Sequence, residues 1–543
     1  MVKLLFSSLP IVLLVFLMTR KNSMPSSKAL PLVALVLYFI LMVVFGHDAN
    51  LVHANVLSGL LVAWTPILII AGAVFLFRTM EATGSLTIIR QWLNKLTQNK
   101  VAQLMLVGWT FTFLIEGASG FGTPAALAAP ILVGLGFPPV RTAILTLIMN
   151  SISVTFGAVG TPTWFGFSAI NLSAAETLEI GFKSALINSV AALVIPAIAL
   201  LFVVKPQSVL RNWLFILSSV LFTIIPYLLV ARFNYEFPSL VGGAVGMAGT
   251  VLLARSGFGL SKSEVQLHEK IGDSQLLHNP PLTTEPSANP SPGQIIKASF
   301  PLWGTLLLLI VTRIPQLGIR QLLDATHPAL FFNLGSLGDL RVSASLVVSL
   351  EGIFGTAVGW THKLLYVPSL LPFGVISIIT FLIYSTKQKV VQDVWSETLL
   401  QLKKPTLALM GALVFVNLMM MGGETSAVTT IGRSLADLTG QSWKYFASFL
   451  GAIGAFFSGS NTISNLTFGG IQDSIALQLG LERTTILALQ SVGGTMGTMV
   501  SINNIVAVSS VLALGNIEGH ILKRTVRAML VFGFIAALMA VFI

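Results

Sequence analysis

Apolar runs recur along the whole chain, each of about the 20 residues that a helix needs to cross a bilayer. Apolar residues make up 54% of the chain and charged residues only 9%. A soluble globular chain has about 25% charged residues, so this chain has too few to cover a water-exposed surface of its size. The sequence therefore predicts an all-α polytopic membrane protein and disfavours a large soluble helical protein.

The apolar pattern predicts about 12–14 transmembrane helices together with shorter, broken apolar pieces. The candidate spans are 3–19, 29–46, 55–78, 101–118, 141–159, 182–204, 212–231, 237–254, 298–313, 367–385, 405–422, 443–458, 484–500 and 526–543, and the broken pieces are 120–136, 462–480 and 503–515. Basic loops alternate with loops that lack Lys and Arg, which predicts an external N-terminus. The net charge of +11 therefore indicates topology rather than nucleic acid binding.

A proline-rich polar stretch at 256–296 separates the spans into two groups. Such a composition cannot bury a core, so the stretch is predicted to be a disordered cytoplasmic linker. It divides the chain into an N-terminal membrane half, 1–255, and a C-terminal membrane half, 297–543. The external segment 314–366 has interrupted apolar stretches, and no structure is predicted for it.

A weak internal repeat relates the two halves. Gly136-Phe-Pro-Pro-Val-Arg-Thr-Ala-Ile-Leu145 is similar to Gly480-Leu-Glu-Arg-Thr-Thr-Ile-Leu487. Each stretch follows a short apolar piece that opens in small polar residues. Interrupted helices at matching places in two halves are typical of transporter sites, so we expect two inverted repeats with broken or re-entrant helical hairpins.

The segment Glu116-Gly-Ala-Ser-Gly-Phe-Gly-Thr-Pro124 holds the first group of candidate site residues. Its glycines interrupt a helix, and Pro124 fits the first turn of a new one. The free N–H groups and positive dipole end of that new helix could bind a carboxylate. The predicted substrate-binding residues here are Ser119, Gly120, Gly122 and Thr123. The alternative is close helix packing through small residues.

The segment Gly459-Ser-Asn-Thr-Ile-Ser-Asn465 holds the second group. Ser and Asn favour helix caps over helix interiors, so their cluster suggests another helix start facing polar contents. The predicted substrate-binding residues here are Ser460, Asn461, Thr462 and Asn465, and an ordinary capped turn is the alternative. Asn150 opens a polar strip that runs to Pro162, with a partner strip from Gln490 to Asn504. Asn150 is predicted to bind substrate, although the strips could equally serve hydrogen bonds between helices.

Three carboxylates are predicted at membrane depth: Glu116, Glu424 and Asp473. An ionised carboxylate is costly there unless it pairs or takes up a proton, so these residues are candidate proton carriers. Arg141 and Arg483 could counter a substrate anion or anchor turns at the membrane edge. No histidine pair has a convincing metal-ligand spacing, and no nucleophile has a base beside it. No metal site, cofactor or catalytic residue is therefore expected.

Several of these motifs resemble the signature of the bacterial L-lactate permease (lactate/glycolate permease) family. They are Glu116-Gly-Ala-Ser-Gly-Phe-Gly-Thr-Pro-Ala-Ala, Leu132-Val-Gly-Leu-Gly-Phe137, Asn150-Ser-Ile-Ser-Val-Thr-Phe-Gly-Ala-Val-Gly-Thr-Pro162, Gly459-Ser-Asn-Thr-Ile-Ser-Asn465 and Gly515-Asn-Ile-Glu-Gly-His-Ile-Leu-Lys-Arg-Thr525. The resemblance implies proton-coupled uptake of lactate, glycolate and related 2-hydroxy monocarboxylates. It also implies kinship with transporters in which a Ser-Asn-Thr triplet, here Ser460 to Thr462, holds the substrate carboxylate. Ile502-Asn503 and the stretch around Thr425 depart from the family pattern.

The sequence as a whole predicts a secondary active transporter that imports L-lactate, D-lactate and glycolate across the bacterial plasma (inner) membrane by proton symport. The alternatives are transport of another small organic or inorganic anion, sodium coupling, and, as a different class, an anion channel. The expected partners are a small monocarboxylate anion, a proton and membrane lipid, without nucleic acid. A homodimer is an alternative to a single copy.

Overall fold

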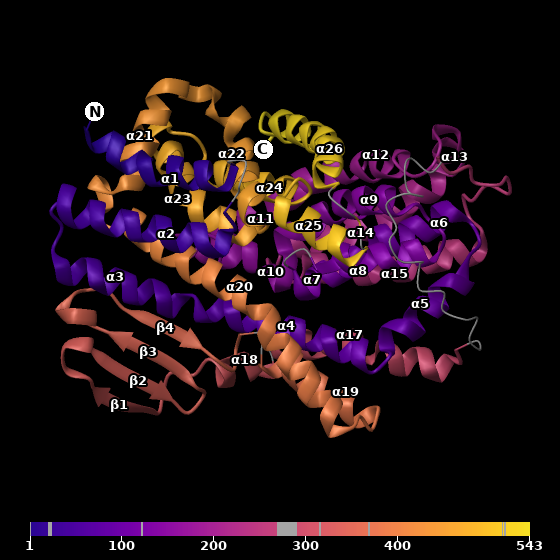
Figure 1. Ribbon diagram of the computed structural model, residues 1–543, viewed down its shortest axis with the longest axis horizontal. Helices are drawn as coiled ribbons and strands as arrows, with labels where there is room; N and C mark the ends of the chain where they lie inside the picture. The colour runs from indigo at the N-terminus through magenta and orange to yellow at the C-terminus, as the bar shows by residue number, and fades with distance from the viewer. Residues whose placement is uncertain are drawn as a thin grey trace. The chain divides into compact units, whose positions relative to one another are not determined.

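A computed structural model describes most of the chain, and it is overwhelmingly helical (Figure 1). The described residues are 2–19, 24–120, 123–268, 290–313, 317–367, 370–512, 514 and 517–543. Among them, eight helices are long and apolar enough to cross a bilayer, and four shorter helices are also apolar. The prediction of an all-α polytopic membrane protein is thus confirmed.

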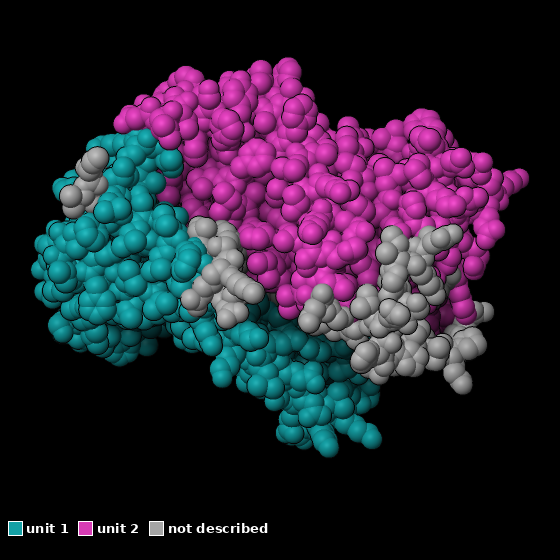
Figure 2. Space-filling model, turned by 45° about the horizontal axis from the view of Figure 1, so that its top comes forward, with its two compact units in different colours: residues 1–89, 292–435 teal, residues 90–291, 436–543 magenta. Residues whose placement is uncertain are grey.

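The chain forms two compact units, each built from two separate stretches of sequence (Figure 2). Unit 1 comprises residues 1–89 and 292–435, and unit 2 comprises residues 90–291 and 436–543. The contacts therefore group the chain differently from the predicted halves. Of the predicted linker, residues 269–289 lie outside the described part. The residues before them are ordered, since the His268 amide donates to the Val203 carbonyl at 3.0 Å.

Unit 1 combines helices with a small sheet. Its helices are α1 (Val2–Thr19), α2 (Ser26–Phe39), η1 (Ile40–Val44), α3 (Ala49–Val62), α4 (Trp64–Ala82), α17 (Pro292–Arg313), α18 (Ile319–Leu323), η5 (Gly335–Leu337), η6 (Ile353–Gly355), η7 (Leu370–Val375), α19 (Ile376–Ile383), α20 (Gln388–Met420) and η8 (Gly423–Thr425). The helices α5 (Ser85–Leu96) and α21 (Ala427–Thr439) begin in unit 1 and end in unit 2.

The sheet lies in the external segment 314–366, for which no structure is predicted from the sequence. Its strands are β1 (Ala329–Asn333), β2 (Asp339–Ser343), β3 (Val347–Glu351) and β4 (Trp360–Lys363), and all neighbours are antiparallel. Leu340 pairs with Leu350, which pairs with Trp360, so these apolar side chains share one face. That face packs on α3, where Leu350 joins a buried cluster with Ala54 (Figure 1).

Unit 2 contains two series of broken helices in the same order. The first series is α7 (Thr112–Ser119), α8 (Thr123–Gly134), α9 (Pro139–Ser151), η3 (Ile152–Phe156) and α10 (Gly157–Trp164). The second series is α22 (Trp443–Ser458), α23 (Asn461–Leu479), α24 (Arg483–Thr498) and α25 (Ile502–Val511). Each series has a break, then a turn at a glycine with positive φ, Gly136 or Gly480, then a second break. This shared order agrees with the repeat seen in the sequence, and the inverted relation of the two series stays a prediction.

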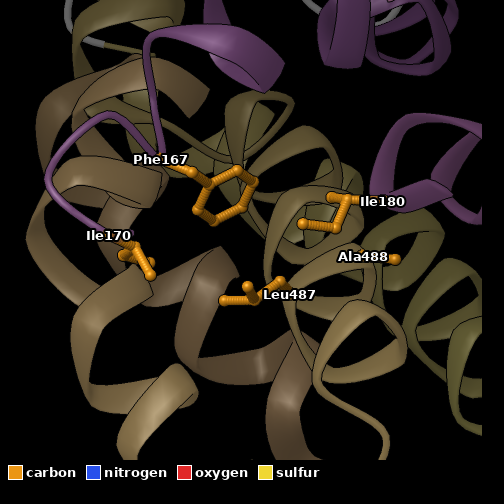
Figure 3. Close-up of a cluster of buried hydrophobic side chains, with 5 residues drawn as sticks. All are labelled: Phe167, Ile170, Ile180, Leu487 and Ala488. Atoms are coloured by element: carbon orange, nitrogen blue, oxygen red, sulfur yellow. The ribbon is translucent and has the colours of Figure 1, made fainter. Parts of the chain in front are cut away.

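The remaining helices of unit 2 pack around the two series. They are α6 (Lys100–Leu104), η2 (Met105–Phe111), α11 (Ala174–Ala192), α12 (Ile195–Leu201), α13 (Pro206–Arg211), α14 (Trp213–Ala231), α15 (Pro238–Ser256), η9 (Gly440–Ser442) and α26 (Glu518–Met539). One buried cluster joins the loop after α10 and the helix α11 to α24, through Phe167, Ile170, Ile180, Leu487 and Ala488 (Figure 3). Burial of these apolar side chains holds the second series against the end of the first.

Candidate functional site

A cavity with an empty volume of about 310 Å³ lies in unit 2, and both series of broken helices line it. This volume includes open solvent. The lining residues are Glu116, Gly120, Asn150, Val154, Gly157, Ala158, Pro162, Gly459, Ser460, Asn461, Thr462, Thr498 and Asn504. Five of the predicted substrate-binding residues and one predicted proton carrier are thus brought together: Gly120, Asn150, Ser460, Asn461, Thr462 and Glu116.

The first break follows α7. Gly120 adopts φ +64°, and its amide donates to the Glu116 carbonyl at 3.0 Å, which ends the helix. A Cβ at this glycine would lie 2.9 Å from the Ala158 Cβ, so only glycine permits this close approach to the second break of the same series. Ser119 ends α7 and Thr123 begins α8, but their side chains, and all of Gly122, lie outside the described part.

Close packing between helices, the alternative role considered for this segment, accounts for Gly117. A Cβ there would lie 2.5 Å from the backbone nitrogen of Leu240 in α15. The glycines of the motif therefore have different structural roles. Gly117 brings two helices together, whereas Gly120 forms the break beside the cavity.

The second break of this series is a run of three left-handed residues. Ala158, Val159 and Gly160 have φ of 44°, 57° and 71°, a region that costs a β-branched residue such as Val159 about 1–3 kcal/mol. Two side chains compensate by donating hydrogen bonds to the carbonyl groups that the break leaves unpaired. The Thr161 hydroxyl donates to the Ala158 carbonyl at 2.5 Å, and the Trp164 indole donates to the Val159 carbonyl at 3.0 Å.

Glu116 and Asn150 form a buried pair across the first series. The Asn150 amide nitrogen donates to the Glu116 Oε2 at 3.0 Å, and the two residues are 1% and 4% exposed. A Cβ at Gly157 would lie 2.5 Å from Glu116 Oε1, so the carboxylate occupies space that a side chain would fill. Among the described residues, none forms a hydrogen bond with the Asn150 Oδ1. Both residues of the pair line the cavity, and the amide oxygen of Asn150 is buried beside it.

The break of the second series places a helix start at the cavity. Gly459 ends α22 in the left-handed conformation, and Ser460 is the N-cap of α23, where its hydroxyl accepts from the Ile463 amide at 3.3 Å. The first amides of the helix, those of Asn461 and Thr462, have no acceptor within it. This helix end therefore supplies N–H donors and a partial positive charge, which suit a carboxylate.

Asn465 and Asp473 are not among the described lining residues. Asn465 is one turn further along α23, and its amide donates to the Pro162 carbonyl at 3.0 Å. Asp473 lies near the far end of α23 and forms an ion pair with Arg483. Glu424 belongs to η8 of unit 1, and its side chain lies outside the described part. Of the two predicted proton carriers whose side chains are described, Glu116 lines the cavity and Asp473 does not.

The two arginines considered as counter-ions also lie elsewhere. Arg141 donates to the Phe202 carbonyl at 2.7 Å, and Arg483 binds Asp473 and, at 3.0 Å, Glu176. Within the described residues, the lining contains neither lysine nor arginine, and no group of His, Asp and Glu could hold a metal ion. The cavity would therefore hold an anion with backbone amides, amide side chains and hydroxyls.

Some lining residues were missed as site residues in the sequence. Gly157, Pro162 and Asn504 lie in the polar strips but were not assigned a role, although Asn504 secures the second break by donating to the Thr498 carbonyl at 3.0 Å. Val154, Ala158 and Thr498 carry no sequence signal, because ordinary apolar and hydroxyl residues become lining residues only through the kinks around them.

Comparison with known proteins identifies relatives over the whole chain. The family model for L-lactate permease matches residues 3–543. A Haemophilus influenzae protein whose L-lactate permease name is provisional is 48% identical over 100% of this chain and 99% of its own. The L-lactate permease of Bacillus subtilis is 28% identical, with coverage of 84% and 81%. The Escherichia coli glycolate permease GlcA is 27% identical, with coverage of 87% and 82%.

One solved structure also aligns along the chain. The YdaH transporter of Alcanivorax borkumensis covers 98% of both chains at 13% identity, with a TM-score of 0.42. A score of this size does not establish a shared fold.

Proposed function

Because this chain belongs to the L-lactate permease family, we propose that it imports L-lactate and related 2-hydroxy monocarboxylates, among them D-lactate and glycolate, by proton symport. Its relatives are permeases, so the chain is a transporter and not an enzyme, and it is a multi-pass protein of the bacterial plasma membrane. The observation that carries the proposal is the cavity where the start of α23 and the buried Glu116 line one space.

We place the substrate carboxylate at the start of α23. The amides of Asn461 and Thr462 and the partial positive charge of the helix end complement a single negative charge. Neutral donors also suit a substrate that must leave again, because a buried full charge would hold it more strongly.

We propose Glu116 as the proton carrier. It is buried in a candidate membrane span, and its described side-chain partner is the neutral Asn150 rather than a cation. An ionised Glu116 and a substrate carboxylate in one cavity would repel each other. Protonation of Glu116 removes that repulsion, so proton and anion binding favour each other, as symport requires.

The broken helices also favour a carrier over a channel. Both series line one site, whereas a channel requires a continuous polar path. Alternating access would expose this single site first to one side of the membrane and then to the other.

Uptake into liposomes tests the proposal. Purified protein is reconstituted, and labelled L-lactate or glycolate is supplied with an inward proton gradient, with an inward sodium gradient, or with neither. We expect accumulation driven by the proton gradient alone. Absence of gradient-driven accumulation of either acid would contradict symport, and accumulation driven by sodium alone would assign the other ion.

The Glu116→Gln variant tests the carrier assignment in the same vesicles. It keeps the shape and one acceptor for Asn150 but cannot release a proton. We expect exchange of lactate across the membrane to persist while accumulation in response to the proton gradient is lost. Accumulation equal to that of the wild type would remove Glu116 as the carrier.

A further inference from the structure

The Asn150 side chain carries a buried amide oxygen that no described group satisfies. Asn150 is 4% exposed, lines the cavity, and its Oδ1 accepts no hydrogen bond. Buried acceptors in folded proteins are nearly always paired, so an unpaired one in a cavity indicates a missing donor. We propose that this oxygen accepts the 2-hydroxyl of the substrate, and that Asn150 thereby selects 2-hydroxy acids over acids without that hydroxyl. The inference rests on the proposed function.

The orientation of the Asn150 amide follows from Glu116. Its nitrogen donates to Glu116 Oε2 at 3.0 Å. An ionised carboxylate can only accept, so rotating the amide by half a turn would set two acceptors against each other. The ionised carboxylate therefore directs the Asn150 nitrogen toward itself and leaves the oxygen for another donor. A protonated Glu116 keeps an oxygen that can still accept from the same nitrogen, so this orientation also suits the substrate-bound state.

Asn461 is the other lining residue with an unpaired amide oxygen, and it is a weaker candidate. Its Oδ1 also has no partner in the part of the chain that the structure describes, while its nitrogen donates to the Thr495 hydroxyl at 3.2 Å. That oxygen lies against Gly494, where a Cβ would collide with it. The oxygen of Asn461 is thus directed at the backbone of α24.

A hydroxyl acceptor of this kind discriminates strongly. A site built to bond a substrate hydroxyl rejects the analogue without it, because the buried acceptor then stays unpaired. We expect wild-type protein to prefer lactate to propionate, its analogue without the hydroxyl, by about tenfold to a hundredfold. Pyruvate, which offers only an acceptor at that carbon, should compete no better than propionate.

Two substitutions at Asn150 separate acceptor loss from general damage. Asn150→Leu has similar bulk and no acceptor, whereas Asn150→Asp keeps an acceptor oxygen. Inhibition of labelled L-lactate exchange in liposomes by unlabelled lactate, propionate and pyruvate gives the affinity of each variant for the three acids. We expect Asn150→Leu to lower the preference for lactate over propionate to about one by weakening lactate alone, and Asn150→Asp to retain the preference.

The outcomes distinguish this inference from the proposed function. Equal weakening of all three acids by Asn150→Leu, or a wild-type protein that does not discriminate lactate from propionate, would overturn the role of Asn150 while lactate transport stands. Absence of lactate transport by the wild type would overturn the proposed function itself and this inference with it. If Asn150→Leu fails to fold, Asn150→Ala and the wild-type ratio provide the same test.

Discussion

The hydroxyls of Thr155 and Thr495 lie 2.8 Å apart, although 340 residues separate them in the chain. Thr155 belongs to the first series of broken helices and Thr495 to the second. The Asn461 amide donates to Thr495 at 3.2 Å, and the Asn188 amide donates both to Thr155 at 2.8 Å and to the Tyr227 hydroxyl at 3.0 Å. A buried hydrogen-bonded chain therefore runs from the cavity lining into α14 and joins the two series.

Replacing either threonine of this pair by valine should destabilise the protein. Each single change leaves buried amide and hydroxyl donors without an acceptor, at a cost of about 1–3 kcal/mol. The double variant should cost less than the sum of the single variants, because the two threonines share one interaction. Unfolding by SDS in mixed micelles measures these free energies, and strict additivity would show that the pair is not coupled.

The pair formed by Ser219 and Thr250 serves as the matched control. Their hydroxyls lie 2.6 Å apart, are buried between α14 and α15, and do not line the cavity. Thr250→Val should also lose stability but leave lactate affinity unchanged, whereas Thr495→Val should weaken lactate binding through Asn461. Equal affinities in the two variants would contradict a link between this network and the site.

Ser460→Ala should weaken both the start of α23 and substrate binding. Loss of the N-cap hydroxyl costs about 0.5–2 kcal/mol and loosens the amides that would hold the carboxylate. Ser173→Ala is the matched control, since Ser173 caps α11 with its hydroxyl 3.2 Å from the Glu176 amide and does not line the cavity. We expect similar losses of stability but weaker lactate binding only for Ser460→Ala, as measured by lactate inhibition of exchange.

Gly157→Ala should displace the Glu116 carboxylate. The new Cβ would lie 2.5 Å from Oε1, and overpacking of this kind costs about 1–3 kcal/mol. Gly134→Ala is the control, because its Cβ would meet nothing within 4 Å and alanine favours the helix by up to about 1 kcal/mol. Proton-driven uptake should fall only in Gly157→Ala, and the added mutation Glu116→Asp should recover part of the lost stability by shortening the carboxylate side chain.

The sequence predicted the breaks that depend on local chemistry. Glycines and capping residues clustered between apolar runs favour helix ends, so the breaks at Gly120 and Ser460 and the helix starts beside them could be foreseen. The left-handed run at Ala158 and Val159 could not, because neither residue favours that conformation by itself. Packing against Gly120 and side chains such as Trp164 stabilises it, and these are tertiary contacts.

Pairings over long sequence distances account for what the sequence left open. It identified Glu116 and Asn150 separately, but only the folded chain shows that they bond across 34 residues. Each compact unit is built from two separate stretches of sequence, and this grouping also depends on contacts between distant residues. The same is true of the sheet at 329–363. Strands of four or five residues give too short an alternation to stand out, and contact with α3 completes their core.

Asp473→Asn should leave proton coupling intact. The structure places Asp473 in an ion pair with Arg483, which also holds Glu176 at 3.0 Å, and not in the cavity lining. Partly exposed pairs of this kind contribute up to about 1 kcal/mol, and Arg483 keeps a partner after the change. We expect a small loss of stability and normal proton-driven accumulation in liposomes. Loss of accumulation in a folded Asp473→Asn variant would restore Asp473 as a candidate carrier.

His362 should make the stability of the protein depend on pH. It lies in β4, 6% exposed, with Nδ1 2.9 Å from the Thr65 hydroxyl and with Nε2 unpartnered. Burial lowers the pKa of His362 below its ordinary value of about 6.5, because the charged form would lose its water. The unfolded chain then binds more protons than the folded one as pH falls through this range.

The free energy of unfolding should therefore be highest above about pH 6.5 and decrease toward the lower pKa of the folded state. His362→Gln keeps a polar side chain that does not titrate, so the difference between its unfolding free energy and that of the wild type should shrink or reverse from about pH 7.5 to about pH 5.5. SDS unfolding of both proteins across that range measures the difference. A difference that does not change with pH would show that His362 takes up its proton equally in the folded and unfolded states.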